Sequence, residues 1–220
     1  MYNHQLISNI IKPVTDFKDL SGVIDMLDNL NLEQIPVVND EGIYLGLLDR
    51  SALYDLETEE GVDVVNLPLK KIAVPSEAHC FTAAKIQQQF SLDLVPVVNS
   101  ENEYVGAITN DNLLTFFGNL TGINEQGALI VIEMKDVDYS ISQLSRLVET
   151  NDAHITQLNT TNDPQTGLIT ITLRINKQDV STIISTFQRY EYNVIYYMGE
   201  ERYENELKSN FNNLMAFLEI

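Results

Sequence analysis

The side chains that most often carry catalysis or bind metals are few and scattered along this chain. His4, His79 and His154 lie in unrelated segments. Neither HExxH, CxxC, GxSxG, a Walker A motif nor GxGxxG occurs in the sequence. Asp136 and Asp138 could pair on a metal, but a turn after a strand also explains them. These patterns predict a protein that is not an enzyme.

Composition narrows the class of partner. The chain has 220 residues, a formal net charge of -19, 44% hydrophobic residues and a single cysteine, Cys80. A strongly acidic surface repels nucleic-acid phosphates and anionic lipids, so neither is an expected partner. A lone cysteine excludes an intramolecular disulfide and fits a reducing compartment. The first residues lack the basic and apolar regions of a signal peptide, and the sequence contains no apolar run of about 20 residues. We therefore expect no signal peptide and a cytoplasmic protein.

The feature that organises the first half is an internal repeat. Leu32–Leu53 aligns without gaps on Leu92–Leu113, at a constant offset of 60 positions. Each copy has a Pro-Val-Val strand, a turn and a second strand that contains Gly46 or Gly106. A glycine there predicts the close approach of a backbone or a ligand. The apolar residues of the helix predicted before each hairpin also align at this offset. Cys80 takes the position that Leu20 has in the first copy, which indicates that Cys80 is a small buried hydrophobic residue.

The repeated pattern, a helix followed by PVV[ND], a turn and a glycine-containing strand, resembles the cystathionine-β-synthase (CBS) domain. The two copies in tandem resemble a Bateman module. The resemblance covers roughly residues 7–117 and implies a first CBS domain at 1–60 and a second at 61–120.

The resemblance also implies where a ligand would bind. In CBS domains a hydroxyl after the glycine meets phosphate, and a carboxylate three residues later meets the ribose hydroxyls. Those positions hold Thr109 and Asn112 in the second copy, with Asp111 one residue early. The family pattern places adenine against Val95, Pro96, Ile72 and Val74. The alternative is that Thr109 and Asn112 only cap a helix. The corresponding positions of the first copy hold Asp49 and Ala52. Because neither offers the hydroxyl or the carboxylate of the family pattern, we expect no nucleotide site in the first copy.

The second half has a different periodicity. Residues 121–127 have the composition of a linker, and residues 128–199 predict the order βαββαβ of a ferredoxin-like unit. We expect Ser140 to cap its first helix and Asn176 its second. Its order after the CBS pair resembles an ACT domain, although no glycine occurs at residues 135–140, which disfavours amino-acid binding. Residues 200–220 predict an amphipathic helix that covers its own domain or a second chain.

The predicted fold is therefore α+β: a tandem CBS-domain pair, a ferredoxin-like ACT-type domain and a C-terminal amphipathic helix. The domain order resembles acetoin-utilisation accessory proteins. Two functions remain open. One is a regulatory protein whose CBS pair senses an adenosine-type nucleotide and couples it to the ACT-like domain or to an unknown protein partner. The other is a ligand-free dimeric scaffold with degenerate sites. We expect a homodimer, no obligatory cofactor and no metal; an adenine nucleotide is the candidate ligand.

Overall fold

The computed structural model describes residues 1–16, 20–56 and 68–199. The chain divides into two compact units, Met1–Leu120 and Thr121–Ile220. The amphipathic helix expected at residues 200–220 lies outside the described residues, as does the acidic run at residues 57–60. Within the described ranges, no helix combines the length and the apolar character needed to cross a bilayer.

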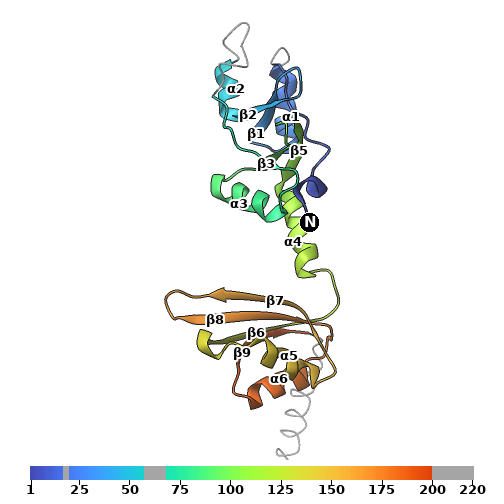
Figure 1. Cartoon of the computed structure of the whole chain (residues 1–220), viewed down its shortest axis with the longest axis vertical. Coiled ribbons are helices and arrows are strands. Elements are labelled where there is room, and N and C mark those ends of the chain that lie inside the picture. The colour runs from blue at the N-terminus through green and yellow to red at the C-terminus, as the bar shows by residue number, and fades with distance from the viewer. Residues whose placement is uncertain (17–19, 57–67, 200–220) are drawn as a thin grey trace, which may run out of the picture. The chain divides into compact units, whose positions relative to one another are not determined.

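The first unit contains the two copies as similar sets of elements (Figure 1). The first copy has α1 (Leu20–Leu30), the hairpin β1 (Gln34–Val38) and β2 (Tyr44–Asp49), and α2 (Arg50–Leu56). The second has β3 (Val74–Pro75), α3 (Cys80–Phe90), β4 (Leu94–Val98), β5 (Tyr104–Thr109) and α4 (Asn110–Thr121). A short 3₁₀ helix, η1 (Asn3–Leu6), precedes them. The predicted strand-turn-strand repeat is confirmed, with antiparallel pairing in both hairpins.

The two copies are joined by reciprocal backbone hydrogen bonds. The Tyr44 N–H donates to the Asn102 carbonyl at 2.9 Å, and the Tyr104 N–H donates to the Gly42 carbonyl at 3.0 Å. The segment that precedes each copy crosses to the outer strand of the other, because Ser8 pairs with Ala107 and Lys70 pairs with Leu47. This exchange explains why the two copies form one compact unit.

The glycines of the outer strands allow this crossing. A Cβ atom on Gly106 would lie 2.2 Å from the Ile7 side chain, and one on Gly46 would lie 2.7 Å from the Leu69 Cβ. Both glycines have positive φ, 155° and 154°. The close approach expected at these glycines is confirmed, and the approaching group is the crossing segment of the chain.

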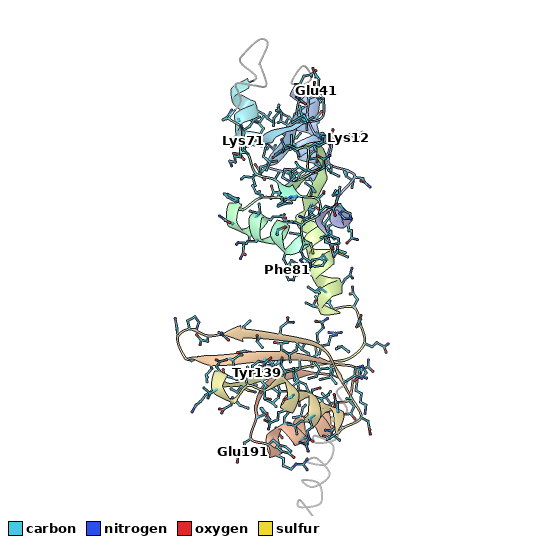
Figure 2. The ribbon with its side chains drawn as sticks, in the orientation of Figure 1. Lys12, Glu41, Lys71, Phe81, Tyr139 and Glu191 are labelled. Atoms are coloured by element: carbon cyan, nitrogen blue, oxygen red, sulfur yellow. The ribbon has the colours of Figure 1, made fainter. Side chains whose placement is uncertain are left out.

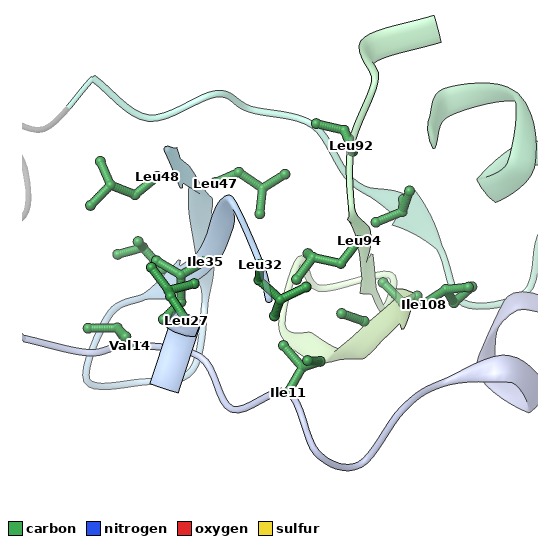
Figure 3. Close-up of a cluster of buried hydrophobic side chains, with 14 of the residues drawn as sticks. Ile11, Val14, Leu27, Leu32, Ile35, Leu47, Leu48, Leu92, Leu94 and Ile108 are labelled. Atoms are coloured by element: carbon green, nitrogen blue, oxygen red, sulfur yellow. The ribbon is translucent and has the colours of Figure 1, made fainter. Parts of the chain in front are cut away.

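One hydrophobic core spans both copies. Buried side chains from each hairpin and each first helix interleave there, and Leu27, Leu47, Leu94 and Ile108 are fully buried (Figure 3). Cys80 is fully buried, which confirms its interpretation as a small hydrophobe.

Tyr44 and Tyr104 stack at the junction of the copies, with ring centroids 6.5 Å apart. The Tyr44 hydroxyl donates to the Ile72 carbonyl at 2.7 Å. Burial raises the pKa of Tyr44 above the ordinary 10.0, and the neighbouring Tyr104 adds to this shift. Burial likewise raises the pKa of Tyr104. The folded state therefore keeps both phenols protonated at pH values where the unfolded chain loses these protons.

We expect the protonated Tyr44 and Tyr104 to contribute fully to the free energy of unfolding of the first unit below pH 10. This contribution should decrease as the pH rises beyond 10. The double variant Tyr44→Phe/Tyr104→Phe should flatten that decrease and should cost about 1 kcal/mol per lost hydrogen bond at neutral pH. Urea unfolding between pH 7 and 11 measures both effects. Tyr197→Phe, a change on a half-exposed ring of the second unit, is the control. An unchanged alkaline slope in the double variant would contradict the prediction.

The second unit is a four-stranded antiparallel sheet in the order β7-β8-β6-β9. Its elements are β6 (Ala128–Lys135), η3 (Asp136–Asp138), α5 (Ile141–Glu149), β7 (Ile155–Asn162), β8 (Leu168–Ile175), α6 (Ser181–Arg189) and β9 (Asn193–Met198). The predicted βαββαβ order is confirmed. Figure 1 shows α5 and α6 on the same side of the sheet, where Ile130, Ile171, Leu144 and Phe187 form the core.

Of the helix caps predicted in this half, one is confirmed and one is wrong. Ser140 caps α5 as expected, because its side chain accepts from the Gln143 N–H at 3.4 Å. Asn176 does not cap α6; its Oδ1 accepts from the His154 N–H, and α6 begins later. The first residue of the expected linker, Thr121, is the last residue of α4. Asp136 and Asp138 form the short turn η3.

Candidate functional site

Thr109 ends β5 and begins the turn into α4. Its hydroxyl oxygen accepts from the Asn112 N–H at 3.3 Å, and the Asn112 Oδ1 accepts in return from the Thr109 N–H at 3.1 Å. This reciprocal pair is a capping box, in which each side chain satisfies a backbone donor of the other residue. The capping interpretation of Thr109 and Asn112 is therefore confirmed as their structural role.

The cap also determines what Asn112 can offer a ligand. Its Oδ1 accepts a second bond, from the Thr109 hydroxyl at 2.8 Å. An amide oxygen has two lone pairs, and both are used here. Asn112 can therefore contact a ligand through its N–H donors, whereas the family pattern would predict an acceptor at this position.

A cavity of about 500 Å³ lies beside this cap. Its apolar wall comes from the crossing segment and the end of α1, and its polar wall comes from the β5–α4 turn. The lining residues are Ser8, Ile10, Ile11, Leu30, Asn31, Leu32, Asp93, Thr109, Asn110, Asp111 and Asn112. Thr109, Asp111 and Asn112, singled out from the sequence, thus share one cavity, which we call the copy-two pocket.

The other predicted contacts do not line this pocket. Val95 and Val74 are in the core, 0% and 2% exposed, and Pro96 is buried. Ile72 is half-buried, and its carbonyl is bonded to Tyr44. The apolar wall is instead built by Ile10 and Ile11 from the crossing segment, with Leu30 and Leu32.

Asp93, which the sequence analysis did not identify, lines the pocket and links the two copies through hydrogen bonds. Its Oδ2 accepts from the Glu33 N–H at 2.9 Å, and its own N–H donates to the Gln34 Oε1 at 3.2 Å. Its carbonyl accepts from the Asn110 N–H at 3.2 Å. No local pattern indicated Asp93, because its partners Glu33 and Gln34 belong to the other copy.

The equivalent place in the first copy is arranged differently. Asp49 aligns with Thr109, and its carboxylate binds the Lys70 ammonium at 2.6 Å. Arg50 pairs with Asp28 beside it. The crossing segment thus supplies a cation to the first copy, where Lys70 and Asp49 form an ion pair at the position that Thr109 has in the second copy.

Two further hollows lie elsewhere. One of about 780 Å³ on α3 and α4 is lined in part by Phe81, Leu113 and Phe117, and Figure 2 marks Phe81 on α3. Another of about 660 Å³ lies at the β6–α5 junction, with Lys135, Asp138 and Ser140 in its wall. Among the described residues, no group of three or more His, Cys, Asp or Glu side chains could hold a metal ion.

No protein-family model matches this chain. Solved structures of CBS domain pair proteins match about half of it, as the repeated hairpins predicted. A CBS domain pair/ACT domain protein from Thermotoga maritima shares 16% identity with a TM-score of 0.46, covering 55% of this chain and 98% of its own. A putative acetoin utilization protein from Vibrio cholerae shares 16% identity with a TM-score of 0.47, covering 56% and 95%.

The protein CBSX2, solved in complex with AMP, shares 16% identity with a TM-score of 0.46, covering 54% of this chain and 97% of its own.

Proposed function

We propose that this chain is a non-catalytic regulatory protein that binds an adenosine-type ligand in the copy-two pocket. The observation that carries the proposal is the difference between the copies. A cavity of about 500 Å³ flanks Thr109 and Asn112, whereas Lys70 binds Asp49 at the equivalent place in the first copy. The proposal expects one ligand per chain.

The walls of the pocket suit a nucleoside. Ligand pockets typically measure ~300–1,000 Å³, and this one is within that range, with more polar than apolar residues in its lining. Ile10, Ile11 and Leu32 provide an apolar surface for a flat base. Asp111 or Asp93 can accept two hydrogen bonds from the vicinal hydroxyls of a ribose, and the Asn112 amide can donate to a ring or sugar oxygen.

The pocket is also placed to transmit a signal. It joins the crossing segment to the start of α4, and α4 continues to Thr121, the first residue of the second unit. A ligand that favours one position of the crossing segment against α4 would shift the population of conformations available to this helix. The second unit, which we propose to be ACT-type, or an unknown protein partner would respond.

A ligand-free dimeric scaffold is the alternative, and an exposed apolar surface favours it. Phe81 is 51% exposed, Leu114 is 71% exposed and Leu120 is 41% exposed on α3 and α4. A symmetric contact between two copies would bury such side chains. We retain the homodimer as a proposal under either function. We also propose domains at 1–60, 61–120 and 128–199, with the linker beginning after Thr121, where α4 ends.

A thermal-shift measurement with AMP, ADP, ATP and S-adenosylmethionine separates the two functions. We expect at least one of them to stabilise the protein by up to about 2.7 kcal/mol at a concentration of 100 Kd. Thr109→Ala should abolish most of this shift, beyond the roughly 1 kcal/mol that the lost helix cap costs without ligand. Thr115→Ala, an exposed change on the same helix, is the matched control. No stabilisation by any of the four compounds would favour the scaffold.

A further inference from the structure

The charges around the copy-two pocket are unbalanced. Two carboxylates, Asp93 and Asp111, are among its eleven described lining residues, and no Lys, Arg or His is among them. Glu33 adjoins the pocket through its N–H bond to Asp93. The chain as a whole carries a formal charge of -19. A phosphate in this pocket would therefore meet negative charge on its near side and in the general field of the protein.

The first copy shows which group is missing. There the crossing segment brings Lys70 to the carboxylate of Asp49 at 2.6 Å. The residue 60 positions earlier is Ile10, an uncharged side chain that lines the copy-two pocket. The first copy thus receives a lysine beside Asp49, whose counterpart is the neutral Thr109. The second copy receives Ile10 beside a pocket that holds Asp93 and Asp111, so its carboxylates have no lysine among the lining residues.

The start of α4 does not reverse this balance. A helix N-terminus normally attracts anions through its free N–H groups and dipole. Here the Asn112 N–H is bonded to the Thr109 hydroxyl, and the Thr109 N–H is bonded to the Asn112 side chain. Asp111 also places a carboxylate in the first turn, where it already occupies the favourable position for negative charge.

We infer that the copy-two pocket selects adenosine-type ligands without net negative charge, with a cationic group favoured over a neutral one and phosphates disfavoured. The inference rests on the proposed function, because it names the ligand class of the same pocket. Asp93 and Asp111 are the specificity-determining residues of this pocket. Their negative charges attract or repel a charged group on the bound ligand, and they take part in no reaction.

Titration calorimetry of the full chain tests this inference with three probes: S-adenosylmethionine as a cation, adenosine as a neutral ligand and AMP as an anion. EDTA and 50 mM salt exclude bridging metal ions and limit screening. A nearby carboxylate changes the affinity for a charged group by roughly threefold to tenfold. We expect S-adenosylmethionine to bind more tightly than adenosine, and AMP to bind at least about tenfold more weakly than adenosine.

The double variant Asp93→Asn/Asp111→Asn should reduce the preference for adenosine over AMP by about fivefold or more. Asp40→Asn removes one charge at an exposed hairpin turn and should leave the preference unchanged. If the double variant does not fold, the wild-type protein still tests the inference, since raising the salt to 500 mM should narrow the gap between adenosine and AMP.

The outcomes separate this inference from the proposed function. If none of the three probes binds, the proposed function fails. If AMP binds as tightly as adenosine, the nucleoside site stands and the charge selection is wrong. A preference that neither the double variant nor salt alters would also overturn the inference.

Discussion

Replacing Gly106 with alanine is expected to lower the free energy of unfolding of the first unit by about 3 kcal/mol. A Cβ at this position would lie 2.2 Å from the Ile7 Cγ2, inside the crossing that joins the two copies. The backbone also has φ of 155°, where a side chain is strained. Strain and overpacking each cost about 1–3 kcal/mol, and the Ile7 side chain would have to shift to make room for the new Cβ.

Urea unfolding monitored by circular dichroism measures this effect. Gly118→Ala is the matched control, because nothing lies within 4 Å of its Cβ position and the residue is within α4. Replacing this helical glycine with alanine should raise the free energy of unfolding of the first unit by about 0.5–1 kcal/mol. The crossing would be less tightly packed than described if Gly106→Ala cost under about 0.5 kcal/mol.

Truncating Phe187 is expected to have an effect of similar or larger size in the second unit. This ring on α6 is fully buried and meets Tyr192 edge-on, with centroids 5.7 Å apart. Phe→Ala changes in well-packed cores cost about 3–5 kcal/mol. Because the two units have separate hydrophobic cores, we expect two unfolding transitions, with only the second unit's transition shifted in Phe187→Ala.

Phe90→Ala serves as the control, since Phe90 is 46% exposed and its loss should cost about 1 kcal/mol or less in the first unit's transition. Differential scanning calorimetry resolves the two transitions. If Phe187→Ala moved a single common transition, the proposal that the first and second halves fold as separate domains would be contradicted.

The repeated hairpins were predictable because their signals are local. A Pro-Val-Val strand, an Asx turn and a strand with glycine repeat at the same offset, so each copy indicated the fold of the other. The alternating strand β8 and the helix α5, with its Ser140 cap, were likewise recognisable from short stretches. The predicted cap of α6 by Asn176 was wrong, because the Asn176 side chain accepts instead from the distant His154 N–H. No local pattern indicates that contact.

The pocket was only half predictable for the same reason. Thr109, Asp111 and Asn112 are on one turn and could be named from the resemblance. Ser8, Ile10 and Ile11 reach the pocket because the crossing segment of one copy joins the other copy, and a repeat does not reveal such an exchange. Val95 and Val74 were expected at a ligand, but they pack in the shared core.

The most direct test of the proposed site is a crystal structure of the protein grown with saturating S-adenosylmethionine. It should show one molecule per chain, between the crossing segment at Ser8–Ile11 and the capping pair Thr109 and Asn112, with Lys70 still bound to Asp49. A ligand found beside Asp49 in the first copy, or in the hollow lined by Phe81 and Phe117, would contradict this account, as would a chain with no ligand.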